Sequence, residues 1–329
     1  MRAWRVHELG HPSDVLVLED IPSPDPPAGQ ARIRVEATNV NFADILVCQG
    51  IYQDRPGVPL TPGTEACGVV QAVGAGIDLA VGARVAAMTN MRHGGYGEEA
   101  LINAESALVM PDDLDAADAT VLYSTFQTAH VGLFHRCQIE AGQWVLVLGA
   151  SSGVGAAAVQ LAAERGARVI ATAGGPDKQA HCRALGAEIV VDSTGQEAAD
   201  ELYAATMDVT GGAGVDAAFD PVGGSLGNVT RRLMAFEGRL VVIGFASGDI
   251  PSYPGNHLLV KNYSVLGMAW AEYTTRLRSV IEAAHDDILH LHREGRIRTD
   301  VATVPLEGLP AALAAIEART VIGRLAMVP

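Results

Sequence analysis

The clearest hydrophobic pattern in the chain is an uninterrupted apolar run, Val145 to Leu148, that ends at Gly149. A short run of this kind is typical of a parallel strand that is covered on both faces. After a glycine-rich turn, Ala156 to Arg165 has the amphipathic pattern of a helix that ends at Gly166. The pattern therefore predicts a strand, a tight turn and a helix, followed by a second strand from Arg168 to Ala173.

Apolar strands and helical stretches alternate between about Ser124 and Lys261. This alternation predicts an α/β domain with a doubly wound parallel sheet. A sixth strand, Tyr263 to Met268, is expected at a sheet edge, where unpaired backbone groups favour a homodimer. The five strands before it are predicted at 145–149, 168–173, 188–192, 215–219 and 239–244. Helices at 276–295 and 309–319 and a final strand at 324–328 follow.

The first part of the chain, Met1 to about Tyr123, has a different pattern. Short strands are separated by turn residues, and in one of them Ile33 and Val35 alternate with charged side chains, as in a strand with one buried face. The segment Ser23 to Gly29, SPDPPAG, is a rigid turn. This part is predicted to be an irregular, barrel-like β domain.

Composition and charge narrow the possible functions. The 329 residues, 49% of them hydrophobic, are enough for two domains with a large core. A net charge of −15 disfavours binding to nucleic acids and to anionic membranes. The four cysteines form no CxxC pair, and the N-terminus lacks the apolar core of a signal peptide, so we expect a cytoplasmic protein. The uncharged stretch 141–163 is long enough to span a membrane, but its glycines and serines favour the turn described above.

The turn after the first α/β strand has the chemistry of a nucleotide-binding loop. Gly153 and Gly155 let the backbone approach a ligand, and the helix N-terminus faces a pyrophosphate. Glycine-rich turns also occur for steric reasons alone, so the prediction of nucleotide binding depends largely on the surrounding α/β pattern. No acid ends the second strand, and Lys178 follows it, which favours NADP over NAD. A lysine on a helix is also typical of a solvated face.

Other chemistries have weak signals. The histidines of one predicted helix, His285, His290 and His292, lack the HExxH arrangement of a zinc site, and no Ser/His/Asp order typical of a hydrolase stands out. The pairs Asn41/Asp44 and Thr64/Glu65 fit either ordinary turns or a site. Metal-dependent and hydrolytic mechanisms are therefore disfavoured.

Several segments resemble one known family. They are NVNFADIL around residues 40–45, PGTEACGVV from Pro62, HGGYGEEALI from His93, LGASSGVGAAAVQLA from Leu148, FDPVGG from Phe219, GRLVVIGFASG from Gly238 and NHLLVKNYSVLG from Asn256. On these motifs the chain resembles the zinc-independent, ζ-crystallin-like quinone oxidoreductases of the medium-chain dehydrogenase/reductase superfamily. In zinc-dependent members a cysteine and a histidine occupy the positions of Asn41 and Thr64, so the resemblance implies no metal.

The resemblance also implies an organisation and a reaction. A GroES-like catalytic domain would consist of residues 1–124 and a return segment, 266–329, with a Rossmann domain at 125–265 that binds NADPH. The expected reaction transfers hydride to a quinone or another electron-poor conjugated C=C acceptor, such as an enone or enal. The alternatives are an enoyl or 2-haloacrylate reductase and a noncatalytic NADPH-binding protein.

Site residues follow from the same resemblance. Asn41, Tyr52 and Ser124 are expected to be catalytic. The proton donor is water, the ribose hydroxyl or Tyr52, and the resemblance does not choose among these three. Ser193 stands where relatives often place a tyrosine against the cofactor phosphate. The expected cofactor-binding residues are Asn41, Ser124, Ser152, Gly153, Val154, Gly155, Gly174, Lys178, Ser193, Phe245, Ala246, Met268, Ala269 and Arg319. Lys178 and Arg319 are expected to contact the 2′-phosphate.

Overall fold

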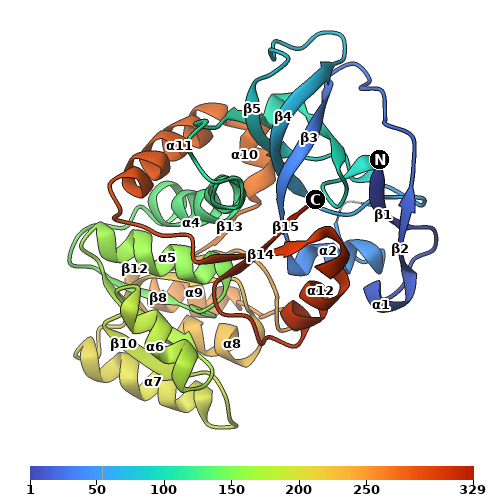
Figure 1. The fold of residues 1–329 in the computed structure, drawn as a ribbon. Coiled ribbons are helices and arrows are strands. Elements are labelled where there is room, and N and C mark those ends of the chain that lie inside the picture. The colour runs from blue at the N-terminus through green and yellow to red at the C-terminus, as the bar shows by residue number, and fades with distance from the viewer. Residues whose placement is uncertain (54) are drawn as a thin grey trace. The chain divides into compact units, whose positions relative to one another are not determined.

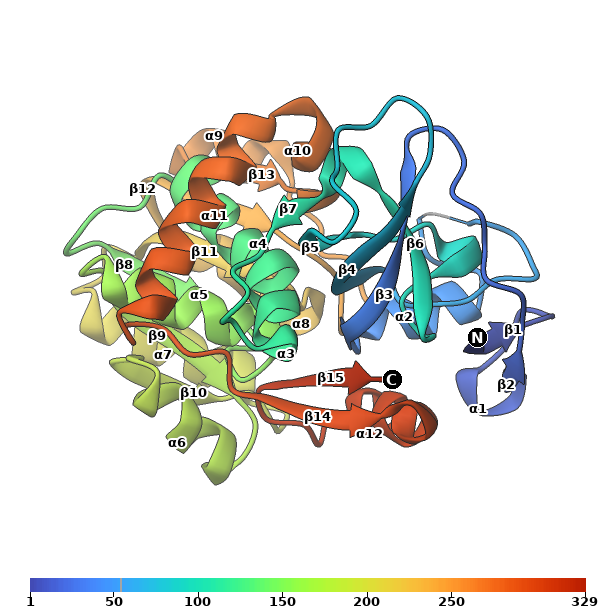
Figure 2. The ribbon, with the colours of Figure 1, turned by 45° about the horizontal axis from the view of Figure 1, so that its top comes forward.

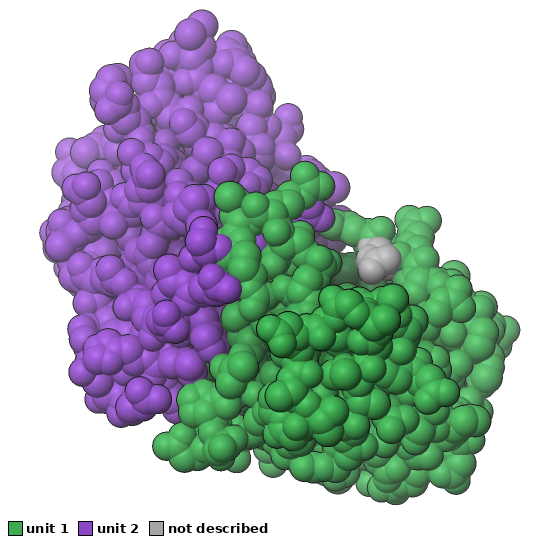
Figure 3. Space-filling view, turned by 90° about the horizontal axis from the view of Figure 1, so that it is seen from above, with its two compact units in different colours: residues 1–124, 274–278, 299–329 green, residues 125–273, 279–298 purple. Residues whose placement is uncertain are grey.

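The computed structural model describes residues 1–53 and 55–329 and divides the chain into two compact units. Unit 1 contains residues 1–124, 274–278 and 299–329, and unit 2 contains residues 125–273 and 279–298 (Figure 3). Each unit is thus assembled from segments that are distant in sequence. Within the described parts of the chain, no helix has both the length and the apolar character needed to cross a membrane.

Unit 2 is built on a six-stranded parallel sheet in the order β10-β9-β8-β11-β12-β13. Counted from β8, this is the order 3-2-1-4-5-6 of dinucleotide-binding folds. The strands are β8 (Trp144–Val147), β9 (Arg168–Ala173), β10 (Ile189–Asp192), β11 (Val215–Asp220), β12 (Met234–Val242) and β13 (Ser264–Gly267). The predicted sheet is confirmed, with β13 at its edge.

Helices pack on this sheet because their apolar faces join its buried strands. Leu146, Ile170 and Leu240 of the sheet share one core cluster with Leu202 and Leu233 of the helices. Figure 1 shows α6 and α7 beside β10. The helices of unit 2 are α4 (Gln127–His130), η4 (Val131–Arg136), α5 (Gly153–Glu164), α6 (Pro176–Ala184), α7 (Ala198–Val209), α8 (Gly224–Leu233) and α9 (Gly255–Lys261). Three more helices contain a unit boundary: η3 (Val121–Phe126), α10 (Trp270–Arg276) and α11 (Arg278–Arg293).

Unit 1 is largely β structure. A seven-stranded sheet has the order β14-β15-β3-β4-β5-β7, with β6 also paired to β3, and β1 pairs with β2 separately. Ile33 and Val35 point into its core, as their alternation predicts. The strands are β1 (Arg2–Val6), β2 (Leu16–Asp20), β3 (Gln30–Asn39), β4 (Glu65–Val73), β5 (Arg84–Met88), β6 (Glu99–Asn103), β7 (Leu108–Val109), β14 (Val301–Pro305) and β15 (Arg324–Val328).

The C-terminal segment completes unit 1. Its strand β15 pairs with β3, through Ala326 and Asn39, and β14 pairs with β15 (Figure 2). Leu309 and Leu313 of the adjacent helix α12 (Leu309–Glu317) join a core cluster with Trp4 and Ile45. The other helices of this unit are α1 (Pro12–Val15), η1 (Met91–His93), α2 (Phe42–Cys48), η2 (Ala104–Ser106), α3 (Ala116–Thr120) and η5 (Leu306–Gly308).

The division differs from the sequence prediction in the return segment. Residues 266–329 are predicted to complete the catalytic domain, but 266–273 and 279–298 belong to unit 2. The reason lies in α11, whose Asp287 accepts hydrogen bonds from His130 at 3.0 Å and from Arg165 at 2.6 Å. The helix period was readable in the sequence, but the partner of its buried face was not.

Candidate functional site

The glycine-rich turn of unit 2 joins β8 to α5, one turn earlier than the helix predicted from Ala156. Ser152 is the N-cap of α5, and its side chain accepts a hydrogen bond from the Gly155 amide at 3.3 Å. Gly149 has φ +57°, a conformation that favours glycine. The first amides of a helix have no acceptor within the helix, so this end of α5 suits an anion.

Gly155 permits the close approach of α5 to the turn. A Cβ on this residue would lie 2.3 Å from the Gly149 carbonyl oxygen and 2.8 Å from the Ala150 Cα. Both neighbours are backbone atoms, so neither can rotate away. The geometry thus supplies the tight turn and the dipole that a pyrophosphate needs.

The ends of the next two strands lie beside this turn. The Ala150 amide donates to the Thr172 carbonyl at 2.9 Å, and the Ser193 amide donates to the Ala173 carbonyl at 3.2 Å. A Cβ on Gly174 would lie 2.8 Å from the Thr194 methyl carbon, so a small residue is needed there. Lys178 is partly buried in the first turn of α6.

The remaining predicted residues of unit 2 follow β12 and β13. The Ala246 amide donates to the Pro221 carbonyl at 3.1 Å, and the Met268 amide donates to the Val242 carbonyl at 3.2 Å. Because all strands of the sheet are parallel, these residues lie with the glycine-rich turn at the carboxyl ends of the strands, which we call the carboxyl edge. The predicted residues at the carboxyl edge are Ser152, Gly153, Val154, Gly155, Gly174, Lys178, Ser193, Phe245, Ala246, Met268 and Ala269.

Unit 1 brings Asn41 and Ser124 together at a buried carboxylate. The Glu65 Oε1 atom accepts from Asn41 Nδ2 at 2.9 Å and from Ser124 Oγ at 2.7 Å. Asn39 Nδ2 donates to the same oxygen at 3.0 Å, and the Thr64 hydroxyl donates to Oε2. Glu65 therefore fixes two of the three predicted catalytic side chains, those of Asn41 and Ser124.

Asp44 is a second buried carboxyl group in this cluster. Its Oδ1 accepts from the Gly63 and Thr64 amides at 3.1 and 3.2 Å, and its Oδ2 accepts from the Asn41 amide at 3.0 Å and the Tyr96 hydroxyl at 2.6 Å. Burial, followed by the nearby charge of Glu65, raises the pKa of Asp44 to about 7, although the hydrogen bonds from Tyr96, Asn41 and Gly63 oppose the shift. Asp44 connects the start of α2 to the loop before β4.

Three members of this cluster, Asn39, Tyr96 and Arg324, were not predicted from the sequence. The Arg324 guanidinium donates to Asn41 Oδ1, and the buried Tyr96 hydroxyl bonds Asp44. Burial lowers the pKa of Arg324, while the charges of Glu65 and Asp44 oppose that effect. An arginine at the start of the apolar strand RLAMV was the available signal, but its partner Asn41 is 283 residues away.

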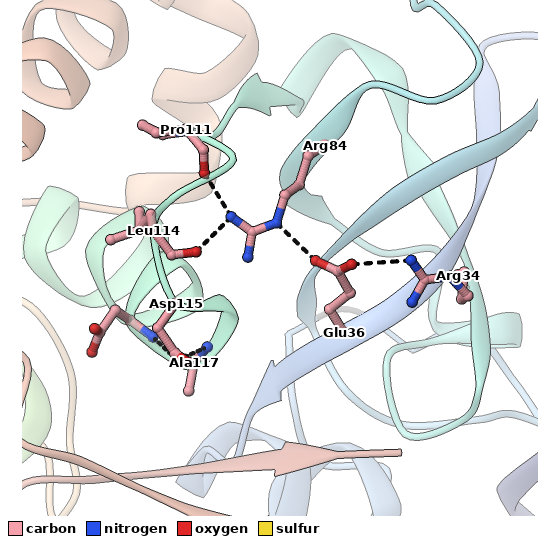
Figure 4. Close-up of polar contacts among 8 residues, drawn as sticks. Arg34, Glu36, Arg84, Pro111, Leu114, Asp115 and Ala117 are labelled. Atoms are coloured by element: carbon pink, nitrogen blue, oxygen red, sulfur yellow. Dashed lines mark hydrogen bonds and ion pairs between the residues drawn. The ribbon is translucent and has the colours of Figure 1, made fainter.

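Ser124 is positioned by an anchored segment that precedes it. Arg84 donates to the Pro111 and Leu114 carbonyls at 2.7 Å each and to Glu36 at 2.7 Å (Figure 4). Asp115 then caps α3, which continues into the π-helical segment η3 that contains Ser124. A π-helical turn of this kind is frequent at functional sites.

Tyr52 and Arg319 lie in unit 1 outside this cluster. Tyr52 is partly buried against an apolar cluster that includes Val6, Leu60 and Met91. Arg319 is exposed after α12 and has φ +56°. The functions predicted for these two residues stay predictions.

The donor set of the cluster does not suit zinc. Asn41 and Thr64 supply an amide and a hydroxyl, whereas zinc sites in proteins use thiolate, imidazole or carboxylate ligands. Among residues 1–53 and 55–329, no group of three His, Cys, Asp or Glu side chains could hold a metal ion. All four cysteines are buried free thiols, and burial raises the pKa of Cys48 and Cys67 to about 12.

The fold and the carboxyl edge define a two-unit protein of the dinucleotide-binding α/β class. Two family models match the chain: "Alcohol dehydrogenase GroES-like domain" over residues 27–115 and "Zinc-binding dehydrogenase" over residues 153–286. Quinone oxidoreductase-like protein 2 of Rattus norvegicus is 34% identical over 92% of this chain and 85% of its own length. The Nematostella vectensis homologue is 34% identical over 90% and 80%.

Solved structures are also similar to this chain. A mycobacterial protein complexed with NADPH is 29% identical, with a TM-score of 0.91 over 100% of both chains. Escherichia coli quinone oxidoreductase complexed with NADPH is 26% identical, with a TM-score of 0.90 over 100% of both chains. The enoyl reductase CurK is 25% identical, with a TM-score of 0.84 over 99% of this chain and 98% of its own. The chain belongs to the ζ-crystallin-like quinone oxidoreductase group of the medium-chain dehydrogenase/reductase superfamily.

Proposed function

We propose that this protein is an NADPH-dependent oxidoreductase that reduces a quinone or another electron-poor conjugated C=C acceptor. The observation that carries the proposal is the tight Gly149–Gly155 turn, which opens onto α5 at the carboxyl edge of a 3-2-1-4-5-6 sheet. The two NADPH-bound relatives support the choice of cofactor. NADPH would supply the hydride.

In this proposal the residues of unit 2 bind and orient the cofactor. The α5 amides and Gly153 to Gly155 hold the pyrophosphate, Gly174 and Lys178 border the adenosine phosphate, and Phe245 lies beside the nicotinamide pocket. Ser193, Ala246, Met268 and Ala269 complete this proposed set.

The proposed task of unit 1 is to supply oriented polar groups to cofactor and acceptor. Glu65 and Arg324 hold the two ends of the Asn41 side-chain amide, and Glu65 also holds the Ser124 hydroxyl. Donors fixed in advance can stabilise charge that develops on an acceptor oxygen. Because Asn41 and Thr64 are poor zinc ligands, a conjugated acceptor, whose charge is delocalised, fits this site. Tyr52 stays a proposed proton donor.

A panel of acceptors tests the proposal. NADPH oxidation is followed with quinones, enones, 2-enoyl thioesters and 2-haloacrylates at equal concentrations. Turnover of quinones or enones supports the proposal, and exclusive turnover of enoyl or haloacrylate substrates favours the second candidate, to which the CurK likeness points. NADPH binding without turnover of any acceptor would identify a noncatalytic binding protein.

We expect active protein to contain less than stoichiometric zinc, because Asn41 and Thr64 occupy the two ligand positions. Elemental analysis by plasma mass spectrometry, before and after dialysis against a chelator, provides the measurement. One zinc per chain that leaves together with the activity would contradict this expectation.

Lys178 is expected to contact the 2′-phosphate, and Lys178→Ala should raise the Kd for NADPH about tenfold while that for NADH stays within about twofold. The chain has only two lysines, Lys178 and Lys261, so acetylation followed by mass spectrometry contains an internal control. Adenosine 2′,5′-bisphosphate should protect Lys178 and leave Lys261 reactive. Equal protection of both lysines, or of neither, would show that Lys178 has no phosphate contact.

We further propose a homodimer that forms through the β13 edge. Among the described strands β13 pairs with β12 alone, so its other edge can accept a second copy. Three exposed apolar side chains lie close by: Leu259 and Val260 on α9, which precedes β13, and Phe236 on β12. Their side chains are 77%, 78% and 73% exposed. The Glu237 amide donates to the Asn262 carbonyl at 2.7 Å, and this hydrogen bond links the segment that contains Phe236 to the end of α9.

Light scattering at micromolar concentration should give about twice the chain mass of 34.3 kDa. The double variant Leu259→Asp/Val260→Asp should be monomeric, because burying two carboxylates in an apolar interface is unfavourable. Val81→Asp, at a 63% exposed valine of unit 1, is the matched control and should stay dimeric. A monomeric wild type would refute the proposed interface.

A further inference from the structure

Asp192 places a carboxylate next to the position where β9 lacks one. It is the last residue of β10, and in the parallel register it pairs with Ala173, the last residue of β9. In NAD-dependent folds an acid at the end of the second strand binds the ribose hydroxyls. Here the acid lies at the carboxyl end of the neighbouring strand, β10, where its spacing from the glycine-rich turn in the sequence does not reveal it.

Donors from two segments, the residues that follow β10 and the start of α6, converge on this carboxylate. Asp192 Oδ1 accepts from the Thr194 amide at 2.8 Å and the Thr194 hydroxyl at 2.6 Å, and Oδ2 accepts from Gln179 Nε2 at 2.8 Å. The Gly175 amide also donates to Asp192. The Thr194 bonds are the main cause of a pKa for Asp192 below its ordinary value, so the carboxylate is ionised at neutral pH.

These donors belong to the same structure that would receive a 2′-phosphate. Gly175 is the N-cap of α6, whose first turn carries Lys178, and Gln179 follows it. The missing side chain of Gly174 faces the next segment: a Cβ there would lie 3.5 Å from Ser193 Oγ and 2.8 Å from Thr194 Cγ2. A phosphate beside Lys178 would therefore be repelled by the negative charge of Asp192. The amide of Gly175, the N-cap of α6, already donates to Asp192 and is not available to that phosphate. A ribose hydroxyl, in contrast, carries no negative charge that this carboxylate would repel.

We propose that Asp192 is a specificity-determining residue that weakens the preference for NADPH and allows NADH to bind. This inference rests on the proposed dinucleotide function. It deepens that function, because it assigns Lys178 and Asp192 opposite effects on the same phosphate.

Calorimetric titration of the full-length protein with NADPH, NADH and adenosine 2′,5′-bisphosphate tests the inference without turnover. Asp192→Asn retains an oxygen that can accept the Thr194 bonds but removes the charge. It should tighten NADPH and the bisphosphate about tenfold and leave NADH unchanged or weaker. Asp208→Asn is the matched control, because it removes the same charge from a different acid of unit 2. Asp208 lies in the last turn of α7, the helix that follows Asp192 in the chain, roughly 15 Å along the helix from its first residue.

The outcomes separate this inference from the proposed function. If wild type binds neither dinucleotide, the proposed function fails and the inference fails with it. If wild type binds NADPH but Asp192→Asn leaves the NADPH-to-NADH ratio unchanged, the inference alone is wrong. Equal weakening of both cofactors by Asp192→Asn, with the thermal unfolding midpoint unchanged, would show that Asp192 only supports the loop and would also overturn it.

Discussion

Asp44→Ala is expected to lower the free energy of unfolding by about 3 kcal/mol at pH 5. Four donors lose their acceptor at once: the amides of Asn41, Gly63 and Thr64 and the Tyr96 hydroxyl. A buried donor without a partner costs roughly 1–3 kcal/mol, and a cavity adds to that cost, while water that enters the cavity reduces it. The Asn41 backbone would also lose its link to the loop before β4.

Urea unfolding followed by circular dichroism measures this effect. Asp113→Ala is the matched control: Asp113 is an exposed acid of the same unit, and its replacement should change stability by less than about 0.5 kcal/mol. A loss below about 1 kcal/mol for Asp44→Ala would contradict the assigned contacts.

The same variant should have a distinct dependence on pH. The folded pKa of Asp44, raised to about 7, lies above the unfolded value of about 3.9, so the folded state binds more protons between these values. The contribution of Asp44 to wild-type stability is therefore largest at or below about pH 4 and falls as the pH rises toward 7. Alanine does not titrate, so the gap between wild type and Asp44→Ala should narrow from pH 5 to pH 7. A gap that widens would mean that the folded pKa is depressed.

Gly155→Ala is expected to raise the Kd for NADPH about 100-fold, which corresponds to about 3 kcal/mol. The added methyl group would meet the Gly149 carbonyl and the Ala150 Cα, and relief requires α5 to move away from the turn. That movement withdraws the helix amides from the pyrophosphate. The loss should apply equally to NADH, because both cofactors carry the pyrophosphate.

Titration monitored by NADPH fluorescence, together with a thermal unfolding curve, separates lost binding from lost folding. Gly255→Ala is the control: it lies at the start of α9, and a Cβ there would have no atom within 4 Å. A Gly155→Ala protein that is folded and binds NADPH within about threefold of wild type would show that this turn does not hold the pyrophosphate.

Local features of unit 2 could be predicted because their causes are local. The apolar run before Gly149, the glycine-rich turn and the spacing to β9 follow from residues that are close in sequence. The edge position of β13 was also predicted and is confirmed. The boundaries of helices differed by a few residues, since Ser152 begins α5 before its amphipathic pattern starts.

Contacts between distant segments could not be predicted from such patterns. Arg324 reaches Asn41 across 283 residues, and Tyr96 reaches Asp44 across 52, so neither pair leaves a periodic signal. Asp192 faces α6 only because β10 pairs with β9. Likewise, α11 belongs to unit 2 because its Asp287 meets His130 and Arg165.

By itself the sequence determined the alternation of strands and helices, the glycine-rich turn and the family motifs, because backbone conformation and burial pattern depend on neighbouring residues. Only the tertiary structure decided which charged groups share a site. The pKa of Asp44 is raised because folding buries this carboxyl group near Glu65, and Glu65 takes its hydrogen-bond partners from side chains that folding brings together.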